Sequence, residues 1–315
     1  MKLKYESISG GIVFANIIAI PIMWLSVNLP VLENWALILS EFILLPFIMG
    51  VVSAWCWRNL RLKTKALIGY SVLNGAMAIL LSFLFLGEGV ICLLIVSPLI
   101  FGFVIMGAFA GRRMFKKKDT TLNIGVFSLL FFVFIADLFS DHHYENLVSD
   151  EIIINASPEE VWENIVAFER IEEESKFWLF RLGMPSPVES TVEGYYKGAG
   201  RKCIFSNGYV FDEEMVIFEP GRNLTFDITG QPRDPEIMGH IDILRGQFLL
   251  KDNGDGSTTL TGNSWYRLYV FPSWYFDIWA RSITRNVHLR VMEHVRQLSE
   301  KNTGDLYRSS HLTQH

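Results

Sequence analysis

The sequence predicts a protein of two parts: an all-α membrane bundle of five transmembrane helices, followed by an α+β domain. In the second part, a curved antiparallel sheet of about seven strands surrounds a long C-terminal helix. Three observations predict this. The first 140 residues contain long apolar runs, the net charge changes from positive to negative after them, and the remaining residues form strand-like segments separated by turns. Only 19% of the 315 residues are charged, below the roughly 25% of soluble domains, while 50% are hydrophobic.

The first 140 residues contain five apolar runs that we interpret as spanning helices. Each run has close to the roughly 20 residues that a helix needs to cross a bilayer, and five such runs in succession do not fit a soluble domain. The first run lacks a small-x-small cleavage site before Pro30, so we interpret it as an anchor and not a signal peptide. The runs cover residues 10–29, 35–57, 66–86, 89–111 and 122–139.

The positive charges between the runs predict the orientation. Lys and Arg precede the first run and occupy residues 58–65 and 112–118, whereas residues 30–34 and 87–88 hold none. Cytoplasmic loops carry the excess of basic residues, so we expect a multi-pass protein of the cell (inner) membrane with its N-terminus in the cytoplasm. Five spans then place the C-terminal domain on the extracytoplasmic side. That side depends on the span count, since only residues 87–89 separate the third run from the fourth.

The two parts differ in net charge. Of the 28 Lys and Arg residues 11 precede residue 141, and of the 33 Asp and Glu residues only 6 do, so the net charges are about +5 and about −10. An acidic domain lacks the basic surface of a nucleic-acid binder, so we expect no nucleic-acid partner. The chain has 3 cysteines, of which only Cys203 follows residue 141, and this excludes a disulfide scaffold.

After a linker at residues 141–148, the pattern predicts a domain over residues 149–301. Residues 151–155 form an apolar strand, and Ser157-Pro158-Glu159-Glu160 is typical of a helix start. We expect a second short helix within residues 169–180, a long helix over residues 273–300 and a polar tail at 302–315. Six further strands are predicted at residues 190–196, 201–206, 209–218, 223–229, 240–250 and 258–270.

Several segments of this domain resemble the START-like helix-grip superfamily (SRPBCC), which includes lipid-transfer proteins, polyketide cyclases and the birch pollen allergen. The opening segment EIIINASPEEVWENI is similar to the start of that fold, and later segments resemble a membrane-anchored bacterial branch of it. The resemblance covers about residues 150–300 and implies a cavity between sheet and helix for a hydrophobic ligand, not a shared catalytic motif. The later segments are RKCIFSNG, LRGQFLL, TLTGNSWYRLYVFPSWY and NVHLRVMEHVRQLSE.

Alternation along residues 201–206 suggests which side chains line such a cavity. Arg201, Cys203 and Phe205 share one face, which we expect to point inward. Arg201 would then lie near the cavity mouth and pair with a carboxylate or phosphate of the ligand, the alternative being an exposed surface arginine. We expect Cys203 to be a small buried hydrophobe and not a reactive thiol. The remaining candidate ligand-binding residues are Phe226, Trp265, Tyr266, Trp274, Val287, His288 and Val291.

Evidence for catalysis is sparse. No nucleophile elbow, P-loop, dinucleotide fingerprint or zinc pattern is present, so we expect no cofactor and no metal ion. His288, His240 and Tyr266 are the candidate general acid–base groups, with a structural role as the simpler interpretation for both histidines. Residues 141–145 (DHHYE) read as the polar end of the fifth run and not as a metal site. Glu41 lies inside the second run, where it either has a function or extends to the interface.

The predicted function is the binding of a hydrophobic small molecule or lipid by a domain held at the bilayer, with lipid transfer or sensing as its purpose. A cyclase- or dehydratase-type enzyme acting on an aromatic or polyketide-like substrate is the second hypothesis. A non-catalytic assembly module, docking an unidentified membrane protein, is the third. A cavity-type fold with a short tether favours the first hypothesis, in which the protein is not an enzyme.

Overall fold

The computed structural model describes residues 7–28, 40–87, 89–115, 135, 144–232, 241–270 and 272–312, without the side chains of 25–28, 40–41 and 302–312. The chain divides into two compact units, which are residues 1–142 with 269–274 and residues 143–268 with 275–315. The first is helical, and the second contains the β-sheet. The domain bounds that the sequence predicts, residues 1–140 and 149–301, stay a prediction.

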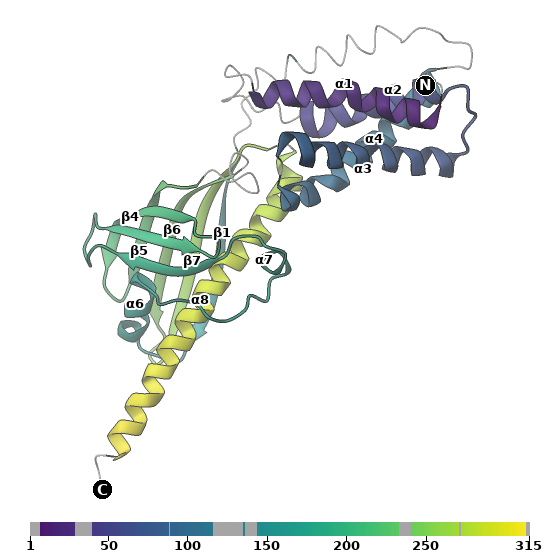
Figure 1. Ribbon diagram of the computed structural model, residues 1–315. Helices are drawn as coiled ribbons and strands as arrows, with labels where there is room; N and C mark the ends of the chain where they lie inside the picture. The colour runs from purple at the N-terminus through teal and green to yellow at the C-terminus, as the bar shows by residue number, and fades with distance from the viewer. Residues whose placement is uncertain are drawn as a thin grey trace. The chain divides into compact units, whose positions relative to one another are not determined.

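Described helices overlap four of the five predicted apolar runs, whereas residues 35–39 of the second run and almost all of the fifth, residues 122–139, lie outside the described residues. Helix α2 packs against α1 and α4, and α3 packs against the same two helices (Figure 1). Two of the described helices, α3 and α4, are long and apolar enough to cross a membrane, and Ile8–Trp24 and Phe42–Trp57 form shorter apolar helices. The elements are α1 (Ile8–Asn28), the π-helix η1 (Ser40–Leu44), α2 (Leu45–Trp57), α3 (Thr64–Leu86) and α4 (Val90–Met114).

Burial in α3 is the reverse of that in a water-soluble amphipathic helix. Small and polar side chains such as Ser71, Asn74 and Ser82 are buried, whereas Leu84 and Phe85 are 60% and 66% exposed. The Asn74 amide connects three helices, because its Oδ1 accepts a hydrogen bond from Asn16 of α1 (2.8 Å) and its Nδ2 donates one to Ser53 of α2 (2.8 Å). In water a helix buries its apolar face, so this arrangement suits a hydrocarbon environment.

Glycines allow α2 and α4 to approach closely. A Cβ atom at Gly107 of α4 would lie 2.0 Å from the Phe47 carbonyl oxygen of α2, and one at Gly50 of α2 would lie 2.1 Å from that of Val104. Gly111, one turn beyond Gly107, also lies against the α2 backbone. This spacing of small residues is typical of helix pairs packed inside membranes.

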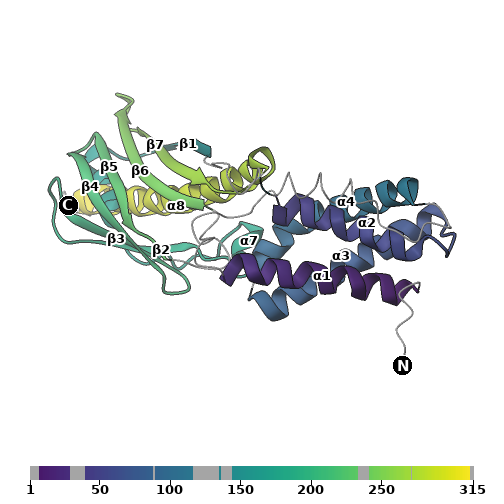
Figure 2. The same ribbon diagram turned by 90° about the horizontal axis from the view of Figure 1, so that it is seen from above.

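The second unit is a seven-stranded antiparallel sheet in the order β1-β7-β6-β5-β4-β3-β2. Figure 2 shows the sheet curled around α8. A curled antiparallel sheet that holds a long C-terminal helix is a helix-grip fold, as the sequence predicts. Its elements are β1 (Tyr144–Ile154), α6 (Pro158–Val166), α7 (Trp178–Arg181), β2 (Pro187–Val192), β3 (Gly200–Phe205), β4 (Val210–Glu219), β5 (Asn223–Gly230), β6 (Ile241–Asp252), β7 (Thr258–Leu268) and α8 (Ser273–Leu312).

Four elements of this unit differ from the prediction. Strand β2 covers Pro187–Val192, where residues 190–196 are expected. Strand β1 begins at Tyr144 within the expected linker, because it pairs with β7 along its entire length. The helix expected within residues 169–180 is reduced to α7, because the preceding backbone pairs with β2, where Ile171 N–H donates to the Val188 carbonyl (2.7 Å). Helix α8 continues to Leu312, beyond the predicted end at residue 300, and no proline follows Pro272 to stop it.

Helix α6 starts as the sequence predicts. Ser157 and Glu160 form a capping box, in which Ser157 Oγ accepts from Glu160 N–H and Glu160 Oε2 accepts from Ser157 N–H. This cap directs the apolar side of α6 into the core, where Val161 and Ile165 are fully buried.

Side chains from α6, the sheet and α8 fill one half of the interior. The Phe226 ring covers Gly246, where a Cβ atom would lie 2.4 Å from it, and the Met292 sulfur covers Gly262. This half is therefore a conventional apolar core. Its buried members are Ile154, Ala156, Val161, Trp162, Ile165, Val166, Phe168, Ile171, Ala199, Met215, Leu224, Phe226, Phe248, Leu250, Leu260, Val291, Met292 and Val295.

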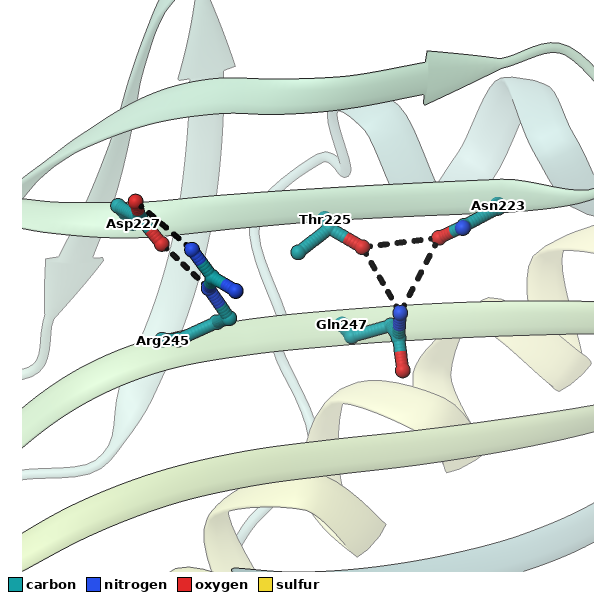
Figure 3. Close-up of polar contacts among 5 residues, drawn as sticks. All are labelled: Asn223, Thr225, Asp227, Arg245 and Gln247. Atoms are coloured by element: carbon teal, nitrogen blue, oxygen red, sulfur yellow. Dashed lines mark hydrogen bonds and ion pairs between the residues drawn. The ribbon is translucent and has the colours of Figure 1, made fainter.

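On β5 and β6 the opposite face of the sheet is polar. Leu224 and Phe226 belong to the core, so Asn223, Thr225 and Asp227 alternate onto the outer face. Figure 3 shows the Gln247 amide donating to Thr225 Oγ1 (2.9 Å) and Asn223 Oδ1 (3.4 Å). Beside them, Arg245 makes two hydrogen bonds to Asp227, of 2.5 and 3.1 Å. Along β5 and β6 the polar side chains of this face are paired with one another, which directs attention to the inner face.

The contact between α2 and α4 can be tested with one pair of variants. Gly107→Leu forces a side chain into the Phe47 backbone, and we expect it to lower the stability of the helical unit by at least about 1–3 kcal/mol. Gly102→Leu on the same helix is the control, because a Cβ atom there meets nothing within 4 Å. Thermal unfolding of the full chain in detergent measures both. Equal midpoints for the two variants would contradict the close packing.

Candidate functional site

A cluster of polar side chains lies on the inner face of the sheet where β1 and β7 face α8. Ser264 of β7, His288 of α8 and Asp150 of β1, together with Arg285 of α8, form what we call the inner polar cluster. Ser264 Oγ lies 2.5 Å from His288 Nε2. On the other side of the imidazole, His288 Nδ1 lies 3.7 Å from Asp150 Oδ2.

Strand alternation brings these residues together. In the β1–β7 pair, Asp150 has the same side-chain direction as the buried Ile154, and Ser264 has that of Tyr266. On α8, His288 follows one turn after Thr284, and both are 5% exposed. The side chains thus come from three segments distant in sequence.

The inner polar cluster is buried but incompletely hydrogen-bonded. Neither Asp150 Oδ2 nor His288 Nδ1 has a hydrogen-bond partner among the described residues. The other carboxylate oxygen, Asp150 Oδ1, lies 2.9 Å from Nε of the exposed Arg285. Ser264 stays partly exposed although it lies on the inner face. Buried polar atoms are nearly always paired, so this unpaired donor–acceptor set calls for an explanation.

A second network lies nearer the start of α8, and we call it the Asp277 network. Asp277 Oδ1 accepts hydrogen bonds from the Tyr266 hydroxyl (2.5 Å) and the Asn146 amide (3.0 Å). Its Oδ2 accepts from Arg281 Nε (2.7 Å). Burial, and then the hydrogen bond to Asp277, raise the pKa of Tyr266 well above its usual range. The phenol therefore keeps its proton. The Asp277 carboxylate, which accepts its hydrogen bond, is also bound by Asn146 and Arg281.

Arg201 points inward as predicted, but the chain itself supplies its carboxylate. Its Nη1 contacts Glu213 Oε2 directly across the β3–β4 pair, and its Nε donates to the Val166 carbonyl (3.0 Å). The guanidinium also lies over the Phe226 ring, 4.7 Å from its centroid. At 3% exposure, Arg201 is part of the core and not of a cavity mouth.

Burial dominates the ionisation of the two acidic groups beside Arg201. It raises the pKa of the Glu213 carboxyl, against the opposing effect of the Arg201 charge. Burial also raises the pKa of the Cys203 thiol to about 12, with a further contribution from the Glu213 charge. Cys203 is thus held as a neutral thiol.

The other predicted ligand-binding residues lie in several different places. Phe226 and Val291 are buried in the apolar core, and the Phe205 ring packs against Phe211 with centroids 4.8 Å apart. Trp265 alternates with the inward Tyr266, so its side chain belongs to the outer face. On α8, Trp274 is 67% exposed and Val287 is partly exposed. His240 is outside the described residues. Of the predicted residues that the structure describes, only Tyr266 and His288 therefore lie in the polar part of the interior.

Sequence reasoning missed Ser264, Asp150 and Asp277. Alternation along β7 places Ser264 on the same face as Tyr266, so a signal for Ser264 existed. Asp150 was missed because the first strand was expected to begin at residue 151. Asp277 lies on α8 among aromatic residues, where nothing in the pattern distinguishes it.

No group of three or more His, Cys, Asp or Glu side chains able to hold a metal ion exists among the described residues. Residues 141–143 of the predicted polar stretch are not among them. Glu145 of that stretch forms an ion pair with Arg267 across the β1–β7 pair. The side chain of Glu41 is likewise not described.

Chemically, the inner polar cluster can bind a polar group or move a proton. A neutral imidazole has one donor and one acceptor nitrogen, so His288 can accept from Ser264 on one side while it presents an N–H toward Asp150 on the other. An oxygen atom beside the His288–Asp150 pair can lie about 2.8 Å from both, because the pair is separated by 3.7 Å.

No protein-family model and no curated protein sequence matches the chain. Three solved structures illustrate what it is similar to. A Nitrosospira multiformis protein has 15% identity and a TM-score of 0.35 over 50% of this chain and 99% of its own. A Mesorhizobium loti protein has 18% identity and a TM-score of 0.34 over 50% and 98%. Norcoclaurine synthase from Thalictrum flavum, in complex with dopamine and hydroxybenzaldehyde, has 12% identity and a TM-score of 0.34 over 50% and 87%. At these TM-scores the fold assignment rests on the strand order and α8.

The buried ion pair can be compared with an exposed one. Arg201→Met leaves the Glu213 carboxylate buried without its cation, and we expect the free energy of unfolding to fall by about 3–5 kcal/mol. Arg245→Met breaks a pair whose side chains are 46% and 38% exposed, and we expect a loss of at most about 1 kcal/mol. Denaturant unfolding of the full chain in detergent measures both. Equal losses would contradict the assigned burial.

The stability of the Arg201→Met variant should also depend on pH, in a direction that the pKa of Glu213 sets. Burial raises the folded-state pKa of Glu213 above its unfolded value of 4.5, and without Arg201 nothing described at this position opposes that rise. A protonated Glu213 is tolerated in the core, so Arg201→Met should be least destabilised at acidic pH and lose stability as pH rises through the raised pKa. A deficit that does not change with pH would count against this account.

The raised pKa of Cys203 predicts its reactivity. An exposed thiol reacts faster with iodoacetamide as pH rises from about 7 to about 9, because its thiolate fraction grows. With a pKa of about 12, Cys203 in the folded protein should stay unmodified over that range and react only after denaturation. Peptide mass spectrometry at several times gives the rate. Fast modification of the native protein would show that the thiol is accessible.

Proposed function

We propose that this protein is embedded in a membrane and that its helix-grip domain binds an amphipathic small molecule or lipid, whose polar group pairs with the inner polar cluster. The observation that carries the proposal is the unpaired, buried donor–acceptor set formed by His288 Nδ1 and Asp150 Oδ2. A bound hydroxyl or carboxylic acid would satisfy both atoms, since each group offers a donor and an acceptor.

The helical unit supports the membrane part of the proposal. Its polar side chains Asn16, Ser53 and Asn74 bond to one another inside the unit, while large apolar side chains cover the outside of α3. Polar groups that meet inside a bundle and apolar groups that face outward are what a lipid environment favours. We accordingly keep the arrangement of five spans with a cytoplasmic N-terminus and an extracytoplasmic helix-grip domain as part of the proposal.

The surroundings of the inner polar cluster favour a ligand with both polar and apolar parts. Ile152 lies two residues along β1 on the same face as Asp150, and it is a partly buried hydrophobe beside the apolar core. Arg285 is exposed at the seam between β1 and α8, with its Nε on Asp150. A ligand entering along this seam would place its polar group between Asp150 and His288 and its apolar part against Ile152.

Aromatic residues at one end of the domain support a location at the bilayer. Strand β1 starts at Tyr144, five residues after the apolar run that ends at Phe139, and Asn146 bonds to Asp277 near the start of α8. At the same end of α8, Ile278 is 63% exposed. The ring centroids of Trp279 and the exposed Trp178 of α7 are 6.5 Å apart. Tryptophan concentrates at membrane interfaces, so this end suits the headgroup region.

The proposal predicts a co-purifying molecule that depends on His288. Mass spectrometry of solvent extracts from the full chain, purified in mild detergent, should detect an amphipathic molecule in near-stoichiometric amount. His288→Gln removes a hydrogen-bonding partner and leaves the buried polar group of the ligand unsatisfied, at a cost of about 1–3 kcal/mol, so retention should fall at least about fivefold.

His294→Gln is the matched control. His294 is also buried on α8, but its Nε2 lies 3.1 Å from the Glu169 carbonyl oxygen, away from the inner polar cluster. This variant should retain the molecule in wild-type amount. An empty wild-type protein, or equal retention by both variants, would sink the proposal.

A further inference from the structure

The arrangement of Ser264, His288 and Asp150 goes beyond what ligand binding requires. A hydroxyl, an imidazole and a carboxylate lie in series, with Oγ to Nε2 at 2.5 Å and Nδ1 to Oδ2 at 3.7 Å. A nucleophile within hydrogen-bonding distance of a base, which a third group orients, is the geometry of covalent catalysis by serine. The three residues come from β7, α8 and β1, so no local sequence motif accounts for their meeting.

We propose that Ser264 is a nucleophile toward the carbonyl of a carboxylic ester, with His288 as its general base and Asp150 as a positioning residue. The inference deepens the proposed function and rests on it in one respect, namely that the ester is an amphipathic molecule held at the inner polar cluster. The partial exposure of Ser264 on an otherwise buried inner face gives a substrate access to Oγ.

The reaction balances as an ester hydrolysis. Ser264 Oγ attacks the carbonyl carbon while its proton passes to His288 Nε2. The bond from that carbon to the alcohol oxygen then breaks, and the alcohol leaves with the proton from His288. A water molecule, deprotonated by His288, attacks the acyl-serine, releases the carboxylic acid and restores the Ser264 hydroxyl. Ester and water thus become acid and alcohol without any redox step.

Asp150 is suited to orient the imidazole. Its Oδ1 is held 2.9 Å from Arg285 Nε, which leaves Oδ2 directed toward His288 Nδ1. A carboxylate on that side favours the tautomer with its proton on Nδ1, in which Nε2 is free to accept from Ser264. The 3.7 Å separation is longer than a hydrogen bond, and a polar group placed beside the pair, as in the proposed function, would bridge it by donating to Asp150 Oδ2 and accepting from His288 Nδ1.

The second buried histidine of α8 shows what is specific about His288. His294 has Nε2 on a backbone carbonyl oxygen, that of Glu169, and Nδ1 3.6 Å from Glu173 Oε2. His294 therefore has a carboxylate beside Nδ1, as His288 does, but its Nε2 faces the Glu169 carbonyl oxygen, whereas Nε2 of His288 faces the Ser264 hydroxyl. The two histidines have similar burial, 5% and 6% exposed, so replacing either one disturbs α8 to a similar degree.

A fluorophosphonate probe tests the nucleophile directly on the full chain in detergent. Attack by Oγ forms an Oγ–phosphorus bond and releases fluoride, which leaves a permanent adduct that peptide mass spectrometry assigns to a residue. We expect the adduct on Ser264, its absence in Ser264→Ala, and labelling slowed at least about a hundredfold in His288→Gln but unchanged in His294→Gln. Asp150→Asn should slow labelling at least about tenfold and shift its pH profile, which a purely structural role would not do.

The outcomes separate this inference from the binding proposal. No adduct on a wild-type protein that unfolds cooperatively, or equal labelling in His288→Gln and His294→Gln, overturns the nucleophile. If the co-purifying molecule is nevertheless retained through His288, the binding proposal stands alone. An adduct on Ser264 in a protein that retains no such molecule supports the nucleophile and overturns stable binding.

Discussion

The pairing of β1 with β7 is the constraint on which the candidate site depends. The eleven residues of β1 pair with β7 without a register shift, from Tyr144 opposite Leu268 to Ile154 opposite Thr258. A slip of one residue would turn Asp150 to the outer face and bring Glu151 inward. The register therefore decides which acidic side chain faces His288, and it also places Asn146 against Asp277. An edge strand that arrives directly after a long apolar run thus determines the chemistry of the interior.

The two units of the chain bury opposite kinds of side chain. In the helix-grip unit, Leu224 and Leu260 are buried and the outer face of β5 and β6 is polar. In the helical unit, Asn74 is buried and Leu84 is exposed. In the proposed membrane location this difference follows from the solvent, since water favours apolar interiors, whereas hydrocarbon leaves helices to associate through polar contacts and close approach. The glycines between α2 and α4 and the Asn16–Asn74–Ser53 contacts supply both.

Much of the fold is predictable from local pattern, whereas the site depends on register. Turn residues and alternation identify the seven strands, and the Ser157 cap identifies α6. Arg201 is correctly expected to point inward, but its partner Glu213 lies on the neighbouring strand, and a single strand carries no information about what lies opposite it. On α8, Val287 and Val291 suggest a buried apolar face. The structure buries Val291 but also His288 and Ser299, whose partners Ser264 and Asn164 lie on β7 and α6.

The length of α8 has a consequence for how the molecule can be handled. The helix has 40 residues, and Figure 1 shows its C-terminal end extending past the sheet. At about 1.5 Å per residue, Leu312 is about 36 Å along the helix axis from His288. A continuous helix of this length places whatever is attached to its end far from the inner polar cluster. A fluorescent or enzymatic reporter fused there reads out the side of the membrane without entering the domain, and a surface attached there leaves the seam between β1 and α8 open.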